Sequence, residues 1–382
     1  MVFFRSLFAP AIALLHAIPV VPAKSCNEKI VPVSITARNA VFGNQKRLVD
    51  DLDVTYFIQN ATTVGLNYTD QVTTGYTTIH DTYDISVRFC EPTAAVKKST
   101  VQVLTHGIGF DKIYWDFPLH PELYSYVDVA TDIFGYSTLS YDRISTGNST
   151  HPDPYNVVQI GVELEILNTL TTMVRAGKLF NTGHIASVVH IGHSYGSVLS
   201  YELAAQHPSN TDGLVLTGFS QPPPTFPSKT ARSNHATLWG KNGLNLDPGY
   251  LTWNDVYANI IDFFYPPTST RDVQEFAEAN KQPFPVGELL TIVAAPLPAT
   301  GFTGPAMIVT GNQDAIFCGG NCGNVVGLGN VSSIPELAGQ NLPHASAFEV
   351  LIQPDTGHAL NLHHNATAAY HAINEFLQRH VS

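Results

Sequence analysis

Apolar and polar positions follow two different patterns along this chain from residue 101 onward. Short runs rich in Val, Ile and Leu are typical of buried strands, and apolar residues spaced three or four apart are typical of amphipathic helices. The first pattern predicts strands at 101–105, 137–141, 186–191, 213–217, 305–310 and 348–352. The second predicts helices at about 157–179, 195–207 and 367–379. This alternation indicates an α/β fold with a doubly wound, mostly parallel sheet and helices on both faces.

Two segments depart from this alternation. Residues 31–90 are rich in Val, Thr, Ile and Tyr with turn residues between them, which predicts several strands. We therefore expect residues 24–100 to form N-terminal strands, an arm joined to the core. Between 221 and 303 no strand is evident and aromatic residues gather, so we expect a helical cap there. Its aromatic side chains would fill the cap and give apolar surface over a site. The core would then consist of 101–220 and 304–382.

The composition is that of a globular protein, because 44% of the 382 residues are hydrophobic and only 13% are charged. The net charge of −12 gives no basic surface, which argues against a nucleic-acid partner.

The first 23 residues are typical of a secretory signal peptide. Arg5 supplies the positive start, an apolar run follows at 7–21, and Val21-Pro22-Ala23 resembles a cleavage site. A membrane anchor is the alternative, but this run is short and contains two prolines. We expect a soluble secreted protein without a stable membrane anchor.

Four cysteines fit an oxidising compartment. Cys318 with Cys322 would close a small loop, and Cys26 with Cys90 would tie the N-terminal arm to the core, although the sequence leaves other pairings open. A zinc site at Cys318 and Cys322 is the rival interpretation, but no second ligand pair lies at zinc spacing. Sequons that permit N-glycosylation start at Asn60, Asn67, Asn148, Asn330 and Asn365.

The sequence Gly192-His193-Ser194-Tyr195-Gly196 is a G-x-S-x-G motif between a predicted strand and a predicted helix. A serine on such a sharp turn has a strained backbone and an exposed hydroxyl, and the glycines avoid collisions with the neighbouring strand and helix. The alternative is a glycine-rich turn that caps a helix. The context favours Ser194 as a nucleophile for acyl transfer.

A serine nucleophile needs a base and an acid that orients it. We predict His358 as the base, because it follows the last predicted strand; His363 and His364 are competitors. We predict Asp314 as the acid, because it follows the strand at 305–310, and Asp355 is its rival.

The developing oxyanion needs two donors. The backbone N–H of Tyr195 would be one, and that of Ile108, in His106-Gly107-Ile108-Gly109, would be the other. We expect His106 to have a structural role and Asp142-Arg143 to brace this loop region.

These motifs together resemble the α/β-hydrolase superfamily, in particular its esterase- and lipase-like branch with a cap and its secreted fungal members. His106-Gly107, the motif at 192–196, Asp314 and Gly357-His358 stand in the expected order, and the resemblance runs from about residue 101 to the C-terminus. A D-x-R-G-x-G-x-S motif is matched only at Asp142, Gly147 and Ser149. The resemblance implies an acyl-enzyme mechanism without metal or organic cofactor.

We therefore expect a serine hydrolase that cleaves a small, apolar carboxylic ester or lactone. An acyltransferase or a serine peptidase could use the same triad, and a binding module with this fold is a further alternative. Product analysis with an added alcohol separates hydrolysis from acyl transfer.

Overall fold

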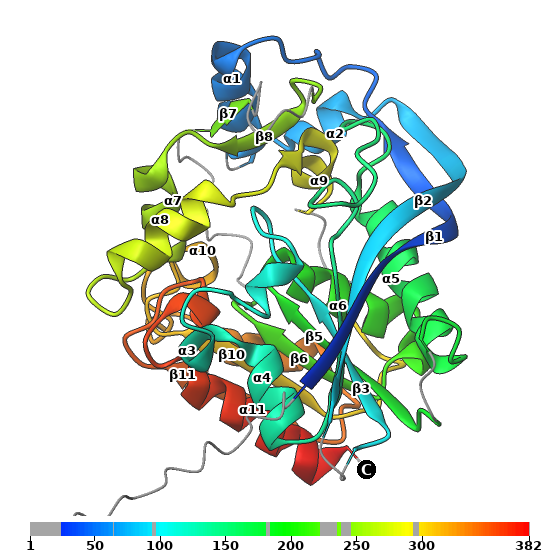
Figure 1. Ribbon diagram of the computed structural model, residues 1–382. Helices are drawn as coiled ribbons and strands as arrows, with labels where there is room; N and C mark the ends of the chain where they lie inside the picture. Colours follow the sequence, from blue (N-terminus) through cyan, green and yellow to red (C-terminus); the bar gives the residue numbers. More distant parts are fainter. Residues whose placement is uncertain are drawn as a thin grey trace, which may run out of the picture.

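The computed structural model describes residues 24–63, 65–93, 97–180, 184–221, 235–237, 246–292 and 298–381. An eight-stranded sheet forms the centre, in the order β1-β2-β4-β3-β5-β6-β10-β11 (Figure 1). The first three strands in this order pair antiparallel, and the remaining pairs are parallel. The predicted α/β fold with a mostly parallel sheet is therefore confirmed. The strands are β1 (Lys24–Val41), β2 (Gly75–Pro92), β3 (Thr100–Thr105), β4 (Ser137–Tyr141), β5 (Ser187–His193), β6 (Gly213–Thr217), β10 (Ala306–Gly311) and β11 (Phe348–Gln353).

Helices cover both faces of this sheet (Figure 1). On one face, a single apolar cluster contains side chains from the five strands β1–β5 and from the helices α5 (Ile160–Arg175) and α6 (Tyr195–Gln206). On the other face, α4 (Tyr126–Asp128), η2 (Val129–Ile133) and α11 (Ala366–His380) pack against the sheet. Shorter elements are η1 (Lys112–Tyr114), α3 (Pro121–Tyr124), η3 (Pro208–Asn210), α10 (Ala315–Cys318), η6 (Ile334–Asn341) and η7 (Leu360–Leu362).

The predicted strands and helices of the core are present within a few residues of their expected ends. The bounds of β4 and β6 agree with the prediction at both ends. The helix expected at 157–179 is shorter, because α5 begins at Ile160 and ends at Arg175. Buried apolar runs with turn residues at their ends are therefore a sufficient signal for these strands.

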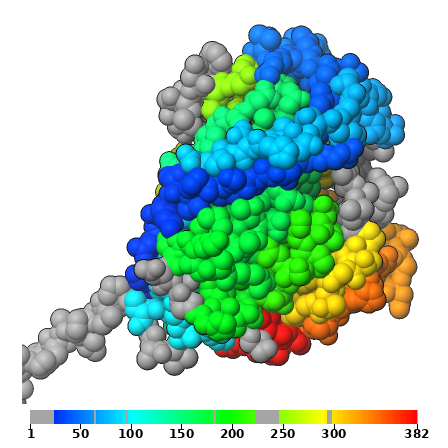
Figure 2. Space-filling view, turned by 90° about the vertical axis from the view of Figure 1, so that its right-hand side faces the viewer, coloured from blue at the N-terminus to red at the C-terminus, as the bar shows by residue number. Residues whose placement is uncertain are grey.

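The prediction for the N-terminal segment is wrong in part. Instead of several strands, its described residues form two long ones, β1 and β2, each 18 residues long, with α1 (Asp51–Ala61) and α2 (Tyr68–Val72) between them. The side chain of Asp50 accepts a hydrogen bond from the N–H of Asp53 and caps α1. In Figure 2 the paired strands cross the molecule as a blue and cyan band, and α1 lies above them. There α1 contacts β7 (His235–Thr237) of the insertion that follows β6.

The insertion itself is not purely helical, which corrects a second expectation. A small antiparallel sheet consists of β7, β8 (Tyr250–Trp253) and β9 (Phe284–Pro285). Its described helices are α7 (Val256–Phe263), α8 (Arg271–Ala279) and α9 (Val286–Thr291). The three strands are too short to show the alternation by which a strand is recognised in a sequence. We call residues 246–292 the cap segment.

Both expected disulfides are present. Cys26 and Cys90 are bonded and face each other in the register of β1 and β2, and Cys318 is bonded to Cys322. Within the described part of the chain, no helix has the length and apolar character needed to cross a membrane. The predicted signal peptide, 1–23, lies outside the described residues.

The two disulfides lead to a prediction about stability. A disulfide stabilises mainly by restricting the unfolded chain, and the effect grows with the length of the loop it closes. Cys26 and Cys90 are 64 residues apart, and Cys318 and Cys322 only four. Replacing the first pair by serine should cost about 4 kcal/mol of unfolding free energy, and replacing the second about 2 kcal/mol. Urea denaturation of the two double variants measures both values. Equal losses would contradict the loop-length argument.

Candidate functional site

Ser194 lies on the sharp turn between β5 and α6, as the sequence predicts. Its φ of 56° and ψ of −120° are rarely adopted by residues other than glycine, so the surrounding structure must hold this conformation. The turn also requires glycine at position 196, because a Cβ atom there would lie only 2.1 Å from the carbonyl oxygen of Thr105. The side chain of Ser194 is largely enclosed, with 7% of the residue exposed.

His358 and Asp314 form the buried pair that the sequence predicts. The His358 Nδ1 and an Asp314 carboxylate oxygen, Oδ2, are 2.9 Å apart, and both residues are fully buried. Asp314 follows β10 and His358 follows β11, so two neighbouring parallel strands present them at the same edge. The rival acid, Asp355, is exposed.

The Asp314 carboxylate is held by more than the histidine. Its Oδ1 accepts hydrogen bonds from the N–H groups of Ile316 and Phe317 at 2.9 Å, and Oδ2 accepts one from the Thr310 hydroxyl at 2.7 Å. Burial alone would raise the pKa of Asp314, but His358 and these donors outweigh it and lower the pKa below its ordinary value. Asp314 is therefore kept ionised although it is fully buried. The Cys318–Cys322 disulfide closes the loop directly after it.

Aromatic rings surround the imidazole of His358. The ring of His193, the residue before Ser194, lies 5.0 Å from it, and the rings of Phe263 and Phe317 lie at 5.6 and 5.7 Å. The His358 Nε2 atom is buried and has no hydrogen-bond partner among the described residues. One ring nitrogen is thus bound to Asp314, and the other is available beside the chain segment that carries Ser194.

The competing histidines have other positions. His363 is buried, and its Nε2 accepts hydrogen bonds from the N–H groups of Gly357 and Tyr265, both at 3.0 Å. Its Nδ1 donates to the carbonyl of Ala359 at 2.9 Å. Both ring nitrogens are therefore occupied in holding the loop that carries His358, and His364 is exposed.

The loop at 106–111, which we call the His106 loop, lies against the nucleophile. A Cβ atom on Gly107 would lie 2.8 Å from the Ser194 Cβ, which places the neighbouring Ile108 at the same turn. Tyr195 is the first residue of α6, and the N–H groups of a helix's first turn have no partner within the helix. The predicted donors thus belong to two backbone segments that contact each other beside Ser194.

His106 has the structural position that the sequence predicts. Its Nδ1 lies 2.9 Å from the carbonyl of Gly107, and its Nε2 accepts the N–H of Arg143 at 3.0 Å. Burial and the nearby Arg143 charge lower the pKa of His106 well below its ordinary value. A neutral imidazole with hydrogen on Nδ1 satisfies both contacts.

Sequence reasoning missed the buried ionic cluster behind this loop. The Arg143 guanidinium binds Glu163 of α5 at 2.5 Å and Glu288 of α9 at 2.6 Å, and it lies over the ring of Tyr195. Burial and the adjacent Glu288 raise the pKa of Glu163 well above its ordinary value despite the arginine. The sequence suggested only that Arg143 braces this region. Its partners are far along the chain, and no local pattern connects them.

One group of potential metal ligands occurs among the described residues, and it lies away from Ser194. It consists of Cys26, Cys90 and Asp116. The two cysteines are joined to each other, so they offer no thiolate to a metal.

Comparisons with solved structures agree with the fold. An esterase from Thermogutta terrifontis is 16% identical with a TM-score of 0.52, covering 78% of this chain and 94% of that one. A hydrolase from Pseudomonas aeruginosa PA01 is 18% identical with a TM-score of 0.50, covering 77% and 95%. A putative lipase from Acinetobacter baumannii AYE is 16% identical with a TM-score of 0.50, covering 88% and 98%. At these identities the likeness concerns the fold alone.

The sequence comparisons place the chain in a family. No curated protein matches it significantly. The family model described as alpha/beta hydrolase family matches residues 102–370, which is more than two thirds of the 382 residues. This chain therefore belongs to the alpha/beta hydrolase family.

Proposed function

We propose that this protein is a secreted serine hydrolase that cleaves a carboxylic ester or lactone. The observation that carries the proposal is the strained turn at Ser194 together with the buried pair of His358 and Asp314. The ring of His193, which precedes Ser194, lies 5.0 Å from that of His358 and connects the two. A serine held in this conformation costs stability, so a site that keeps it points to a use for the hydroxyl. The pair supplies a base whose orientation is fixed.

In the first step the Ser194 Oγ attacks the carbonyl carbon of the substrate. The proton of the hydroxyl passes to the Nε2 of His358, because Nδ1 keeps its hydrogen in the bond to Asp314. The ionised Asp314 then stabilises the imidazolium. The donors to Asp314 from Thr310 and α10 keep its carboxylate in place while the charge of its partner changes.

The negative charge that develops on the carbonyl oxygen needs donors that are already in position. We assign this role to the N–H groups of Ile108 and Tyr195. The contact of Gly107 with Ser194 and the start of α6 at Tyr195 support the assignment. The imidazolium gives its proton to the leaving alcohol oxygen, the ester bond breaks, and an acyl-Ser194 ester remains. Water, activated by His358, hydrolyses this ester and restores the serine. No step uses a metal or an organic cofactor.

An apolar substrate fits the surroundings of His358. Phe263 and Phe317 flank the imidazole, and Phe110 of the His106 loop packs against Phe263 with ring centroids 5.3 Å apart. Aromatic surroundings of this kind favour an apolar acyl group. The same enclosure supports an acyltransferase as a second candidate, because exclusion of water favours an alcohol as acceptor. Product analysis with added ethanol separates hydrolysis from transfer.

Secretion is a separate part of the proposal. It rests on the signal-like sequence at 1–23 and is supported by the two disulfides, which form in oxidising compartments. The sequon residues Asn60, Asn67, Asn148 and Asn330 are exposed, which suits N-glycosylation during secretion.

The triad is tested by steady-state hydrolysis of p-nitrophenyl esters of increasing acyl length. Ser194→Ala and His358→Ala should each lower kcat by about 10⁴-fold or more. Asp314→Asn should lower it by about 10⁴-fold, because the amide favours the wrong tautomer of His358. Asp355→Asn is the matched control and should retain wild-type kcat. Hydrolysis that survives in Ser194→Ala would refute the proposed nucleophile.

The loop that carries the base should lose stability in acid. Burial lowers the pKa of His363 to about 4, while the unfolded chain has the ordinary value near 6.5. Because the unfolded chain takes up the proton first, the contribution is complete above about pH 6.5 and is lost as the pH falls towards 4.

The titration of His363 alone should lower the free energy of unfolding by roughly 2 kcal/mol as the pH falls from 7 to 5. His363→Gln keeps an acceptor but cannot be protonated, so its stability should fall less steeply with acid than that of wild type. His364→Gln, at the exposed neighbour, should keep the wild-type slope. Denaturant titrations at several pH values measure all three. Identical slopes for the two variants would contradict the account.

A further inference from the structure

We propose that Gln282 of the cap segment is a positioning residue, which holds the His106 loop so that the N–H of Ile108 faces the oxyanion. The inference rests on the proposed function, because it assigns a role in the same site. It means that the cap segment is a fixed part of the catalytic machinery as well as a cover.

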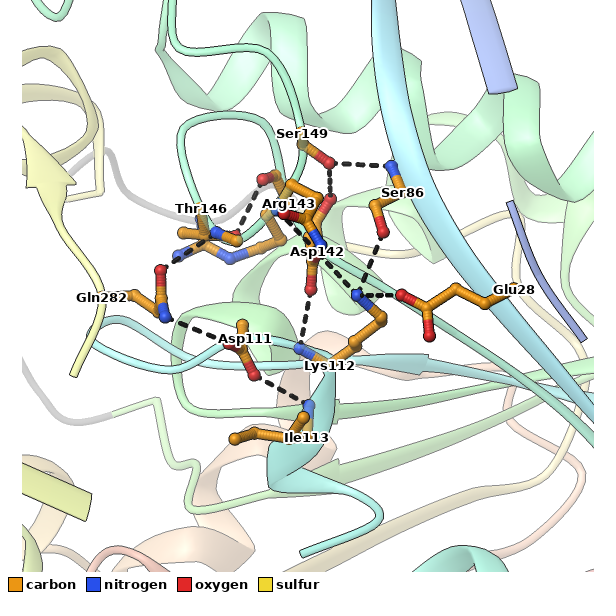
Figure 3. Close-up of polar contacts among 12 residues, drawn as sticks. Glu28, Ser86, Asp111, Lys112, Ile113, Asp142, Arg143, Thr146, Ser149 and Gln282 are labelled. Atoms are coloured by element: carbon orange, nitrogen blue, oxygen red, sulfur yellow. Dashed lines mark hydrogen bonds and ion pairs between the residues drawn. The ribbon is translucent and has the colours of Figure 1, made fainter. Parts of the chain in front are cut away.

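Three hydrogen bonds connect Gln282 to the core. Its backbone N–H donates to the carbonyl of Gly109 at 3.0 Å. Its side-chain Nε2 donates to Asp111 at 3.0 Å, and its Oε1 accepts the N–H of Gly147 at 3.0 Å. Figure 3 shows the amide of Gln282 between the His106 loop and the loop of Asp142. Gly109 follows Ile108 directly and Asp111 lies three residues after it, so these bonds fix the backbone next to the proposed donor.

The loop of Asp142, residues 142–149, is itself rigidly joined to the His106 loop. The Asp142 carboxylate accepts the backbone N–H of Lys112 at 3.1 Å and its Nζ at 2.8 Å, and it also accepts the N–H of Asn148 at 3.0 Å. Lys112 is further paired with Glu28 of β1 (Figure 3). The amide of Gln282 therefore closes a network in which both loops share buried polar partners.

A second contact from the cap segment meets the same loop. The Trp253 ring lies directly on Gly109, where a Cβ atom would be only 2.0 Å from the ring. Gly109 has a φ of 77°, which also excludes most side chains. The Trp253 Nε1 donates to Asp262 at 2.6 Å, and its carbonyl accepts Lys281 Nζ at 2.6 Å. The ring is thus held in place, and Lys281 connects it to the neighbouring Gln282.

The Gln282 amide satisfies both partners, because the Asp111 carboxylate needs a hydrogen-bond donor and the N–H of Gly147 needs an acceptor. No other side chain of this length offers both. Methionine has a similar shape but neither group. Glutamate keeps the acceptor and replaces the donor by a negative charge beside Asp111. A loop displaced by a fraction of an ångström would move the N–H of Ile108 away from the oxyanion without emptying the substrate site.

The titration of Asp111 makes the glutamate variant informative. Burial and the charge of Asp142 raise the pKa of Asp111 to about 6, Glu28 adds to this, and Lys112 and the N–H of Ile113 oppose it. A glutamate at 282 would raise the pKa of Asp111 further, because like charges disfavour ionisation. In acid a protonated Asp111 can donate to this carboxylate, and at high pH the two carboxylates repel each other.

The experiment compares kcat and KM of p-nitrophenyl butyrate for wild type, Gln282→Met, Gln282→Glu, Asn280→Ala and Ser194→Ala. Asn280 is the matched control, because its side chain is exposed and, among the described residues, bonds only the carbonyl of Phe276. Gln282→Met should lower kcat by about 10- to 100-fold with little change in KM. Asn280→Ala should match wild type. For Gln282→Glu, the ratio of its kcat to that of wild type should be low at pH 8 and rise several-fold by pH 5.5.

A kcat for Gln282→Met within twofold of wild type, with Ser194→Ala inactive, would overturn this inference and leave the proposed function standing. Full hydrolysis by Ser194→Ala would overturn both. If Gln282→Met does not fold, the pH ratio of Gln282→Glu decides: a rise towards acid supports the inference, and a constant ratio overturns it.

Discussion

The close approach of two backbones determines the rest of the site. The start of α6 lies so near the end of β3 that Gly196 has no room for a side chain against Thr105. This approach forces the strained turn at Ser194 and brings the His106 loop, which continues from β3, beside the serine. The proposed nucleophile and the proposed backbone donor are therefore placed by packing between secondary-structure elements, which is more rigid than placement by a free loop.

The buried charges of the site depend on a second feature, the ends of two neighbouring parallel strands. The parallel strands β10 and β11 end side by side, so Asp314 and His358 meet although 44 residues separate them. A carboxylate without water is costly unless donors surround it, and Asp314 has them from Thr310 and α10. The buried guanidinium of Arg143 is likewise compensated, because Glu163 and Glu288 both pair with it. Breaking either cluster would leave an unpaired buried charge.

Local patterns in the sequence were enough to predict the strands and helices of the core, but not the contacts between distant segments. The runs that form β4 and β6 are continuous and apolar, so their ends could be read directly. The pairing of His358 with Asp314 followed from the position of each after a strand. The helices α1 and α2 were missed because the β-branched residues of their segment outweighed the cap at Asp50.

The contacts of the cap segment with the core could not be predicted from the sequence. Gln282 and Glu288 come from a segment whose amino acids suggest only a helical insertion, and their partners precede them by more than a hundred residues. Nothing in a single sequence connects such positions. The catalytic roles of Ser194, Asp314, His358, Ile108 and Tyr195 remain predictions that geometry supports.

The central claim is that Ser194 is an activated nucleophile, and covalent labelling with a fluorophosphonate followed by peptide mass spectrometry tests it most directly. The probe requires an activated serine and no knowledge of the substrate. We predict one modified peptide, which contains Ser194, and loss of the modification in folded His358→Ala. Modification of another serine, or none in folded wild-type protein, would contradict it.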